Sequence, residues 1–248
     1  MTRQKILITG ASSGLGAGMA RAFAARGRDL ALCARRIERL DELKAELTAE
    51  YPGITVAVAA LDVNDHDAIP KVFAQFADEL GGIDRVIVNA GIGKGAPLGS
   101  GKLWANLATL ETNLVAAVAQ IETALAMFIA AGGGHLVLIS SVLGHKGFPG
   151  AQAAYAASKA GVSSLGQSLR AQYSSGPIKI TVLEPGYIES EMTAAAAATL
   201  WVADNKSGVA AMVRAIERET GRAVVPWPWV PVVWLLRLLP ARFTKSFA

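Results

Sequence analysis

Residues 5–16 read KILITGASSGLG, a short apolar run that leads directly into a glycine-rich turn. The apolar run is continuous rather than alternating, as is typical of a strand buried on both faces of a parallel sheet. Gly10, Gly14 and Gly16 follow it, and a helical pattern begins beyond them. This stretch predicts a strand, a tight turn and a helix, which together form the opening unit of an α/β fold.

The same unit recurs along the chain. Further strand-like runs read DLALCA (29–34), TVAVAALDV (55–63), RVIVNAG (85–91), HLVLISS (135–141) and KITVLEPG (179–186). Helical patterns alternate with them near residues 15–26, 37–50, 67–80, 103–130 and 152–174. This order predicts an α/β fold in which residues 1–248 form a single domain, a doubly wound (Rossmann) parallel sheet with helices on both faces. Ligands of such sheets bind at the carboxyl ends of the strands.

Composition narrows the class of protein. Of the 248 residues, 52% are hydrophobic and only 18% are charged, which suits one large core. The net charge of +4 is mild, and no run of Lys and Arg suggests a nucleic-acid groove. The single cysteine, Cys33, is interpreted as a core residue and fits a reducing compartment. Because the chain enters its first strand at once, we expect no signal peptide and a cytoplasmic protein.

The three histidines do not predict a metal site. His66, His135 and His145 show no metal-ligand spacing, and no acidic cluster accompanies them. They are interpreted as ordinary polar positions. His145 lies in the loop between Ser141 and Tyr155, where a solvated histidine is favoured over one that reaches the substrate.

The glycine-rich turn is predicted to bind a dinucleotide. Glycine permits close approach of the backbone to a pyrophosphate, whose charge is favoured by the amides and dipole of the following helix. The spacing departs from the G-x-G-x-x-G fingerprint, and a tight turn without a ligand is the alternative. The predicted contacts are Gly10, Ser12, Ser13, Gly14, Leu15 and Gly16.

Two arginines follow the second strand. Many dinucleotide folds place an acidic residue there for the ribose 2′-hydroxyl, whereas this chain has Arg35 and Arg36. A guanidinium matches the oxygens of a 2′-phosphate, so Arg35 predicts NADP(H) in preference to NAD(H). Arg36 is either a second contact of this kind or a solvated charge that opens the next helix.

Small and polar residues also follow the third and fourth strands. Asp62 and Val63 are placed to face an adenine. Asn89, Ala90 and Gly91 form a flat turn that suits a cofactor, although Asn89 also fits a tie between two strands. We predict that the residues after the third strand and those after the fourth strand both contribute to the dinucleotide site.

Residues 153–161 read AAYAASKAG and place Tyr155 and Lys159 on one helix face, because i and i+4 side chains are neighbours. Ser140 and Ser141 end the strand that precedes this helix. A hydroxyl at a strand end and a phenol at a helix start can converge on one carbonyl group, which is the geometry that acid catalysis requires. A nearby protonated lysine is expected to lower the pKa of the phenol.

These motifs together resemble the short-chain dehydrogenase/reductase family, classical type, over residues 4–192. The matching stretches are TGASSGLG, NAG, ETNLVAA, SSVLG, YAASK and PGYIESEM. The resemblance implies that Tyr155 is the general acid/base and that Lys159 binds the nicotinamide ribose. It also implies that Ser141 orients the substrate oxygen, with Ser140 as a structural neighbour. Asn113, within ETNLVAA, would hold a proton-relay water.

The resemblance extends the cofactor site and implies an activity. Pro185 and Gly186 would lie beside the nicotinamide, with the amide of Ile188 on its carboxamide and the hydroxyl of Ser190 nearby. Residues 190–210 would form a substrate lid, for which a plain alanine-rich helix is the alternative. The implied protein is an NADPH-dependent oxidoreductase that acts on a small-molecule carbonyl or secondary alcohol of hydrophobic or lipid-like character. A catalytically silent nucleotide-binding regulatory protein is the competing hypothesis.

The last predicted feature is an apolar C-terminal extension, residues 223–248. It contains Trp227, Trp229 and Trp234. Its apolar run, residues 223–236, is shorter than the roughly 20 residues that span a bilayer, and prolines interrupt it. A contact within a homodimer or homotetramer is favoured over a lipid-lined pocket or peripheral membrane association.

Overall fold

A computed structural model describes residues 3–193, 202–238, 240 and 244. Within these residues, seven parallel strands form one sheet in the order β3-β2-β1-β4-β5-β6-β7. Their bounds are β1 Lys5–Thr9, β2 Asp29–Ala34, β3 Val56–Ala60, β4 Arg85–Val88, β5 Gly134–Ile139, β6 Ile178–Pro185 and β7 Arg222–Val225. The strand order reverses between β1 and β4, and a crevice therefore opens at the carboxyl ends of these strands.

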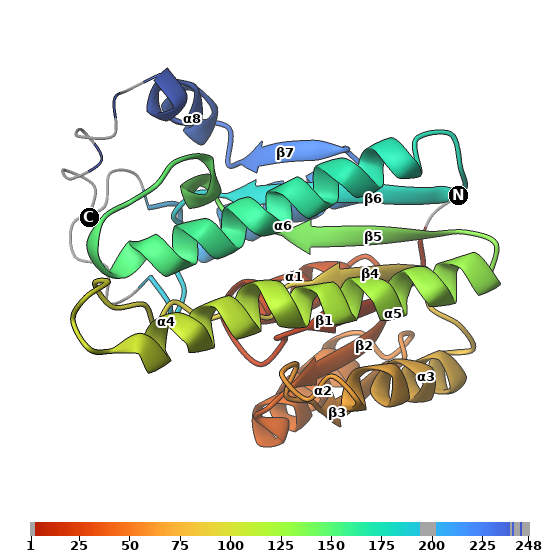
Figure 1. Ribbon diagram of the computed structural model, residues 1–248. Coiled ribbons are helices and arrows are strands. Elements are labelled where there is room, and N and C mark those ends of the chain that lie inside the picture. Colours follow the sequence, from red (N-terminus) through yellow and green to blue (C-terminus); the bar gives the residue numbers. More distant parts are fainter. Residues whose placement is uncertain (1–2, 194–201, 239, 241–243, 245–248) are drawn as a thin grey trace.

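Helices cover both faces of the sheet (Figure 1). One apolar cluster joins the sheet to α1 Gly14–Ala24, α2 Ile37–Glu50 and α7 Asn205–Glu217. The opposite cluster joins it to α3 Ala68–Leu80, α5 Ala116–Ala130 and α6 Ala153–Gln172. Two further segments, α4 Leu103–Leu110 and the π-helical η1 Glu111–Val115, lead into α5. The predicted doubly wound α/β fold is confirmed.

The continuous apolar runs explain this two-sided arrangement. Along β1, Ile6 and Ile8 pack into the first cluster while Leu7 packs into the second, because successive strand residues point to opposite faces. All three side chains are completely buried. Burial of such a side chain contributes roughly 1.5–3 kcal/mol, so an apolar residue at every position of the strand is favoured.

Two elements near the C-terminus were not predicted. The strand β7 pairs in parallel with β6, so the extension predicted at 223–248 begins inside the sheet. The predicted lid, residues 190–210, overlaps α7 from Asn205 onward. Residues 194–201 of this lid, which include the alanine run interpreted as a helix, lie outside the described residues. The apolar pattern did not reveal β7 as a separate strand, because its four residues are followed closely by the apolar stretch that forms α8 Trp229–Leu238.

One helical stretch in the described part of the chain, residues 103–130, is long and apolar enough to cross a membrane by length and composition alone. It comprises α4, η1 and α5. In the structure this stretch packs against α3 and α6, and 44% of its most apolar window is buried within the domain. Its apolar character is therefore partly accounted for by its place in the helical layer.

Candidate active site

The glycine-rich loop after β1 leaves the first amides of α1 without side-chain caps. Ser13 precedes the helix in an extended conformation and makes no side-chain capping bond, and the first turn contains no acidic residue. Glycine is required sterically at two points. A Cβ on Gly16 would lie 2.3 Å from the Gly10 carbonyl oxygen, and one on Gly10 would lie 2.8 Å from Ala90 Cα. The loop thus presents backbone donors and a helix N-terminus to an anion.

This loop forms one wall of a cavity of about 250 Å³ at the carboxyl ends of the strands. The cavity extends from the arginines after β2 to the turn after β6. Every residue predicted to bind cofactor lines it: Gly10, Ser12, Ser13, Gly14, Leu15, Gly16, Arg35, Asp62, Val63, Asn89, Ala90, Gly91, Tyr155, Lys159, Pro185, Gly186, Ile188 and Ser190. Its elongated course and its uncapped helix N-terminus fit a dinucleotide.

Further residues line the same cavity without having been predicted as cofactor contacts, three of them within the predicted lid: Ala34, Leu61, Asn64, Ile92, Thr112, Ile139, Glu191, Met192 and Thr193. Most of them adjoin predicted residues, so extending each strand-end motif by one or two positions would have found them. Glu191 and Thr112 also adjoin predicted residues, Ser190 and Asn113, but nothing else in the sequence points to them. An exposed glutamate and a threonine inside a helical stretch carry no sequence signal for a binding site.

Asn89 performs the tie between strands that was one of its two predicted roles. Its side-chain amide donates to the Thr9 carbonyl at 2.9 Å, and its backbone N–H donates to Thr9 Oγ1 at 3.1 Å. These bonds fix the end of β4 to the end of β1. Because Asn89 also lines the cavity, the tie and a cofactor contact are compatible.

The two arginines after β2 differ in their contacts. Arg36 donates to Ser13 Oγ at 2.7 Å and pairs with Glu191 at 3.3 Å, so it is not a free solvated charge. Arg39 pairs with the same carboxylate, and these hydrogen bonds lower the pKa of Glu191. Arg35 is exposed, and in the described part of the chain its side chain makes no hydrogen bond or ion pair. Arg35 is thus available to a ligand.

Ser141, Tyr155 and Lys159 meet at the inner end of the cavity. Ser141 follows β5 and caps the 3-10 turn η2 Val142–His145, its hydroxyl accepting from Leu143 N at 3.2 Å. The same side chain is hydrogen-bonded to the Tyr155 phenol. Lys159 is buried, and its Nζ lies 5.8 Å from the Tyr155 ring centroid. Strand β5 and helix α6 therefore bring a hydroxyl, a phenol and an ammonium together.

The pKa of Tyr155 differs from the sequence-based expectation. Burial raises it to about 12, against the opposing effect of the Ser141 hydrogen bond. Burial also lowers the pKa of Lys159 to about 8. The net direction for the pKa of Tyr155 is therefore opposite to the lowering expected from the lysine, whose Nζ donates to the Ile139 carbonyl at 2.9 Å. Tyr155 is consequently a neutral phenol, a proton donor, at pH 7.

Asn113 lies in η1 and holds the segment after β4. Its Oδ1 accepts from Ile92 N at 2.7 Å, and its Nδ2 donates to the Ile92 carbonyl at 2.8 Å. A Cβ on Gly91 would meet Asn113 Oδ1 at 3.1 Å and Lys159 Nζ at 3.5 Å, so the two side chains flank this glycine. The predicted proton-relay water stays a prediction. Asn113 does not line the cavity itself.

A smaller cavity of about 140 Å³ adjoins Ser141 and Tyr155. Its other lining residues are Gly93, Val142, Leu143, Ala151, Gln152, Gly186, Tyr187, Met192 and Thr193. Most of these side chains are apolar. The wall formed by Tyr187 is supported from behind by α8, since the rings of Tyr187 and Trp229 lie 5.5 Å apart. This cavity offers an apolar group access to the phenol.

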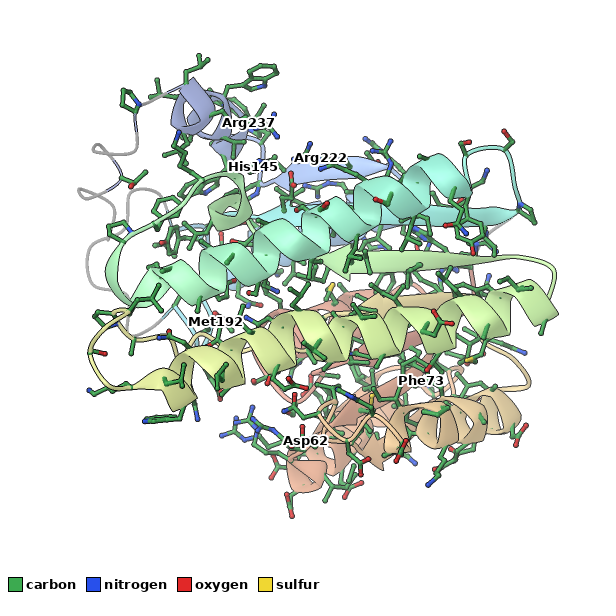
Figure 2. All side chains as sticks on the ribbon, in the orientation of Figure 1. Asp62, Phe73, His145, Met192, Arg222 and Arg237 are labelled. Carbon is green, nitrogen blue, oxygen red and sulfur yellow. The ribbon has the colours of Figure 1, made fainter. Side chains whose placement is uncertain are left out.

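The prediction that His145 is a solvated loop residue is wrong. Its side chain is 5% exposed and lies 3.0 Å from the fully buried Glu184 carboxylate. Arg222 also pairs with Glu184, at 2.7 Å, and Arg237 of α8 donates to His145 Nδ1 at 3.0 Å. Figure 2 labels His145, Arg222 and Arg237, which lie close together where α8 meets the end of the sheet. Nothing in the sequence indicated this buried position, because the residues that contact His145 lie far from it along the chain.

The hydrogen bonds of Glu184 also connect it to α6, the helix that carries Tyr155 and Lys159. Glu184 Oε1 accepts from Ser163 Oγ at 3.1 Å, and Ser163 bonds to Ser140 Oγ at 2.7 Å. Ser140 in turn donates to the Lys159 carbonyl at 2.8 Å. Ser140 is therefore the structural neighbour that the sequence predicted, and it joins the end of β5 to α6.

The remaining titratable residues of interest lie elsewhere. His135 is buried between Arg85 and Thr181, and burial lowers its pKa to about 2. His66 is partly exposed and lies 3.5 Å from Glu111. Cys33 is buried in the core, which raises its pKa to about 12. Among the described residues, no group of three or more His, Cys, Asp or Glu side chains is placed to hold a metal ion.

Comparison with known proteins gives consistent matches. A family model described as short chain dehydrogenase matches residues 4–201. An uncharacterized oxidoreductase of Mycobacterium tuberculosis is 73% identical over 100% of this chain and 98% of its own length. An uncharacterized oxidoreductase of Myxococcus xanthus is 33% identical over 97% of this chain and 94% of its own. The crystal structure of levodione reductase superposes with a TM-score of 0.82 at 27% identity, covering 92% of this chain and 96% of the other.

Proposed function

The chain belongs to the short-chain dehydrogenase family and is an oxidoreductase that binds a nicotinamide cofactor, and we propose that it reduces an apolar carbonyl compound with NADPH. One observation carries the proposal. The Ser141 and Tyr155 side chains line both the long dinucleotide cavity and the smaller apolar cavity. A substrate carbonyl group placed where the two cavities meet would face the cofactor on one side and the Tyr155 phenol on the other.

The residues of the chain have separate tasks in this reaction. A bound nicotinamide supplies or accepts the hydride. Tyr155, as a neutral phenol, gives its proton to the carbonyl oxygen, while the Ser141 hydroxyl orients that oxygen. Lys159 sits behind the phenol with its ammonium on the Ile139 carbonyl, and it holds positive charge beside the cavity at neutral pH. The proton on Tyr155 favours reduction over oxidation at that pH.

We expect apolar ketones and aldehydes to be reduced with a higher kcat/KM than polar carbonyl compounds of similar size. The smaller cavity is lined in part by Val142, Leu143, Ala151 and Met192, whose side chains would contact an apolar substituent. A panel of paired apolar and hydroxylated carbonyls, with NADPH oxidation followed by absorbance, measures this difference. A consistent preference for the hydroxylated member of each pair would contradict the assignment.

The preference for NADPH is supported by the free guanidinium of Arg35 and by Arg36 at the loop. We expect Arg35→Ala to weaken NADPH binding by roughly tenfold or more and to leave NADH binding nearly unchanged, because charge-assisted hydrogen bonds to the 2′-phosphate are lost. Fluorescence titration gives the two Kd values. Arg39→Ala is the matched control, since Arg39 contacts Glu191 and does not line the cavity. Tighter binding of NADH than of NADPH by the unsubstituted protein would overturn the cofactor preference.

A catalytically silent nucleotide-binding protein is the second candidate. NADPH binding with no turnover of any carbonyl in the panel would favour it. The convergence of Ser141, Tyr155 and Lys159 argues against it, because nucleotide binding alone does not require a hydroxyl, a partly buried phenol and a buried ammonium to meet.

We also propose that the protein forms a homodimer or homotetramer and acts in the cytoplasm. Exposed apolar side chains along α4 and the start of α5, including Leu103, Trp104, Leu107 and Val118, support self-association. The single buried thiol, Cys33, suits a reducing compartment. Light scattering of the purified protein measures its assembly.

A further inference from the structure

Helix α8 has one buried face and one exposed apolar face. Trp229, Val233 and Leu236 are almost fully buried. On the other side, Trp234 is 64% exposed and Leu238 is 80% exposed, and Trp227, in the turn just before α8, is 77% exposed. Val230 and Leu235 continue this exposed strip at helical spacing. We call the five exposed residues, 227, 230, 234, 235 and 238, the α8 outer face.

The inner face fastens α8 to the site. A Cβ on Gly186 would lie 2.3 Å from the Trp229 ring, so the indole packs directly on the turn after β6. Leu236 packs in one cluster with Leu143 and Tyr155. Figure 1 shows α8 beyond β7, at the edge of the sheet and toward the carboxyl ends of the strands. The outer face is therefore held in a fixed orientation beside the smaller cavity.

The charge around the outer face is basic. Arg237 is exposed on α8 itself, and the sequence of residues 223–248 includes no Asp or Glu. The two elements against which α8 chiefly packs, η2 and β7, also contain no acidic residue, and β7 begins with Arg222. The Glu184 carboxylate, which reaches α8 through His145, is fully buried and paired. An incoming surface thus meets apolar and positively charged groups.

We propose that the α8 outer face docks on an anionic membrane surface. Exposed tryptophans beside leucines and basic residues match the boundary between lipid headgroups and acyl chains. Anionic lipid attracts a basic segment by about 1 kcal/mol per charge near the surface. A second copy of this chain fits less well, because a two-fold contact would bring the same basic segments together. Docking in this orientation places the smaller cavity next to the lipid, and it does not depend on the proposed reductase activity.

The test is flotation of the full-length protein with phosphatidylglycerol/phosphatidylcholine vesicles and with pure phosphatidylcholine vesicles. We expect binding to the anionic vesicles, weaker binding to the neutral ones and a decrease at high salt. The double variant Trp234→Ser/Leu238→Ser is expected to lower the partition coefficient at least about tenfold, because both side chains lose their insertion into the interface. Ile129→Ser is the matched control, since Ile129 is 62% exposed near the end of α5 and lies outside the α4 surface proposed for self-association.

Further measurements distinguish membrane docking of the α8 outer face from a loss of the fold and from self-association. Thermal melts and NADPH titrations of each variant establish that the fold is retained, as substitutions on an exposed face predict. Removal of residues 223–248 would not serve, because it would also remove most of β7 and the buried Trp229. Equal flotation of the double variant and the unsubstituted protein would overturn the proposal. So would failure of the unsubstituted protein to float, whether or not the double variant changes the oligomeric mass by light scattering.

Discussion

Replacing Tyr155 with phenylalanine is expected to lower kcat for carbonyl reduction by about 10²–10⁴-fold, the range that a positioned general acid contributes. The substitution keeps the aromatic ring in its contacts with Leu143, Ala156 and Leu236 and removes only the phenolic O–H. Because burial raises the pKa of Tyr155 to about 12, the proton is present on the phenol at neutral pH. The Ser141 hydroxyl cannot replace it, since its own alcohol proton is far less acidic. Steady-state kinetics with NADPH measure the loss.

A second phenol supplies the control for this experiment. Tyr187 lines the smaller cavity beside Tyr155 and packs on Trp229, so Tyr187→Phe preserves the wall and removes a hydroxyl from the same space. Its kcat is expected to stay within about tenfold of the unsubstituted enzyme. NADPH titration of both variants separates binding from chemistry. Near-normal turnover by Tyr155→Phe, or a large loss in Tyr187→Phe alone, would contradict the assignment of the proton donor.

Replacing Glu184 with glutamine is expected to lower the free energy of unfolding by about 3–5 kcal/mol. The carboxylate is completely buried, and it pairs with Arg222 at 2.7 Å and with His145 at 3.0 Å. Glutamine has a similar shape but leaves these partners without a counter-charge in a buried site. Urea unfolding monitored by circular dichroism measures the change. Glu46→Gln is the control, because the Arg21–Glu46 pair lies on the surface and should contribute about 1 kcal/mol or less.

The same substitution predicts a pH dependence. Burial by itself would raise the pKa of Glu184, but the hydrogen bonds from His145 and Arg222 outweigh it, and the pKa falls below its ordinary 4.5. A carboxyl whose pKa is lowered on folding stabilises the protein above its unfolded pKa, and this contribution is lost as the pH falls through the folded value. The stability difference between the unsubstituted protein and Glu184→Gln should therefore be full near pH 7 and shrink below about pH 4.5. A difference that grows on acidification would contradict the pairing.

The sequence predicted the parts of the fold that local patterns encode. Continuous apolar runs located six strands, and the glycines of residues 10–16 located the loop at which α1 begins. The short strand β7 escaped, because four residues followed directly by another apolar segment give no distinct period. Helix α7 escaped for a related reason, since its start lay within the stretch assigned to a lid.

The sequence predicted which residues meet at the strand ends better than it predicted which charged side chains form pairs. All predicted cofactor residues line one cavity, because parallel strands must bring their carboxyl ends to one edge. The unequal contacts of Arg35 and Arg36 could not be predicted, since Glu191 reaches Arg36 from a segment 155 positions away. The position of Lys159 on the Ile139 carbonyl depends likewise on the packing of α6 against β5.

By itself, the sequence determined the doubly wound sheet, the glycine turn and the shared helix face of Tyr155 and Lys159, because strand burial, turn conformation and helical spacing depend on neighbouring residues. Only the tertiary structure decided that His145 is buried on Glu184 beneath Arg237, and that one face of α8 is left exposed. Only it decided that burial raises the pKa of Tyr155. These properties depend on the distance and solvent exposure of groups that are remote along the chain, and no local pattern records them.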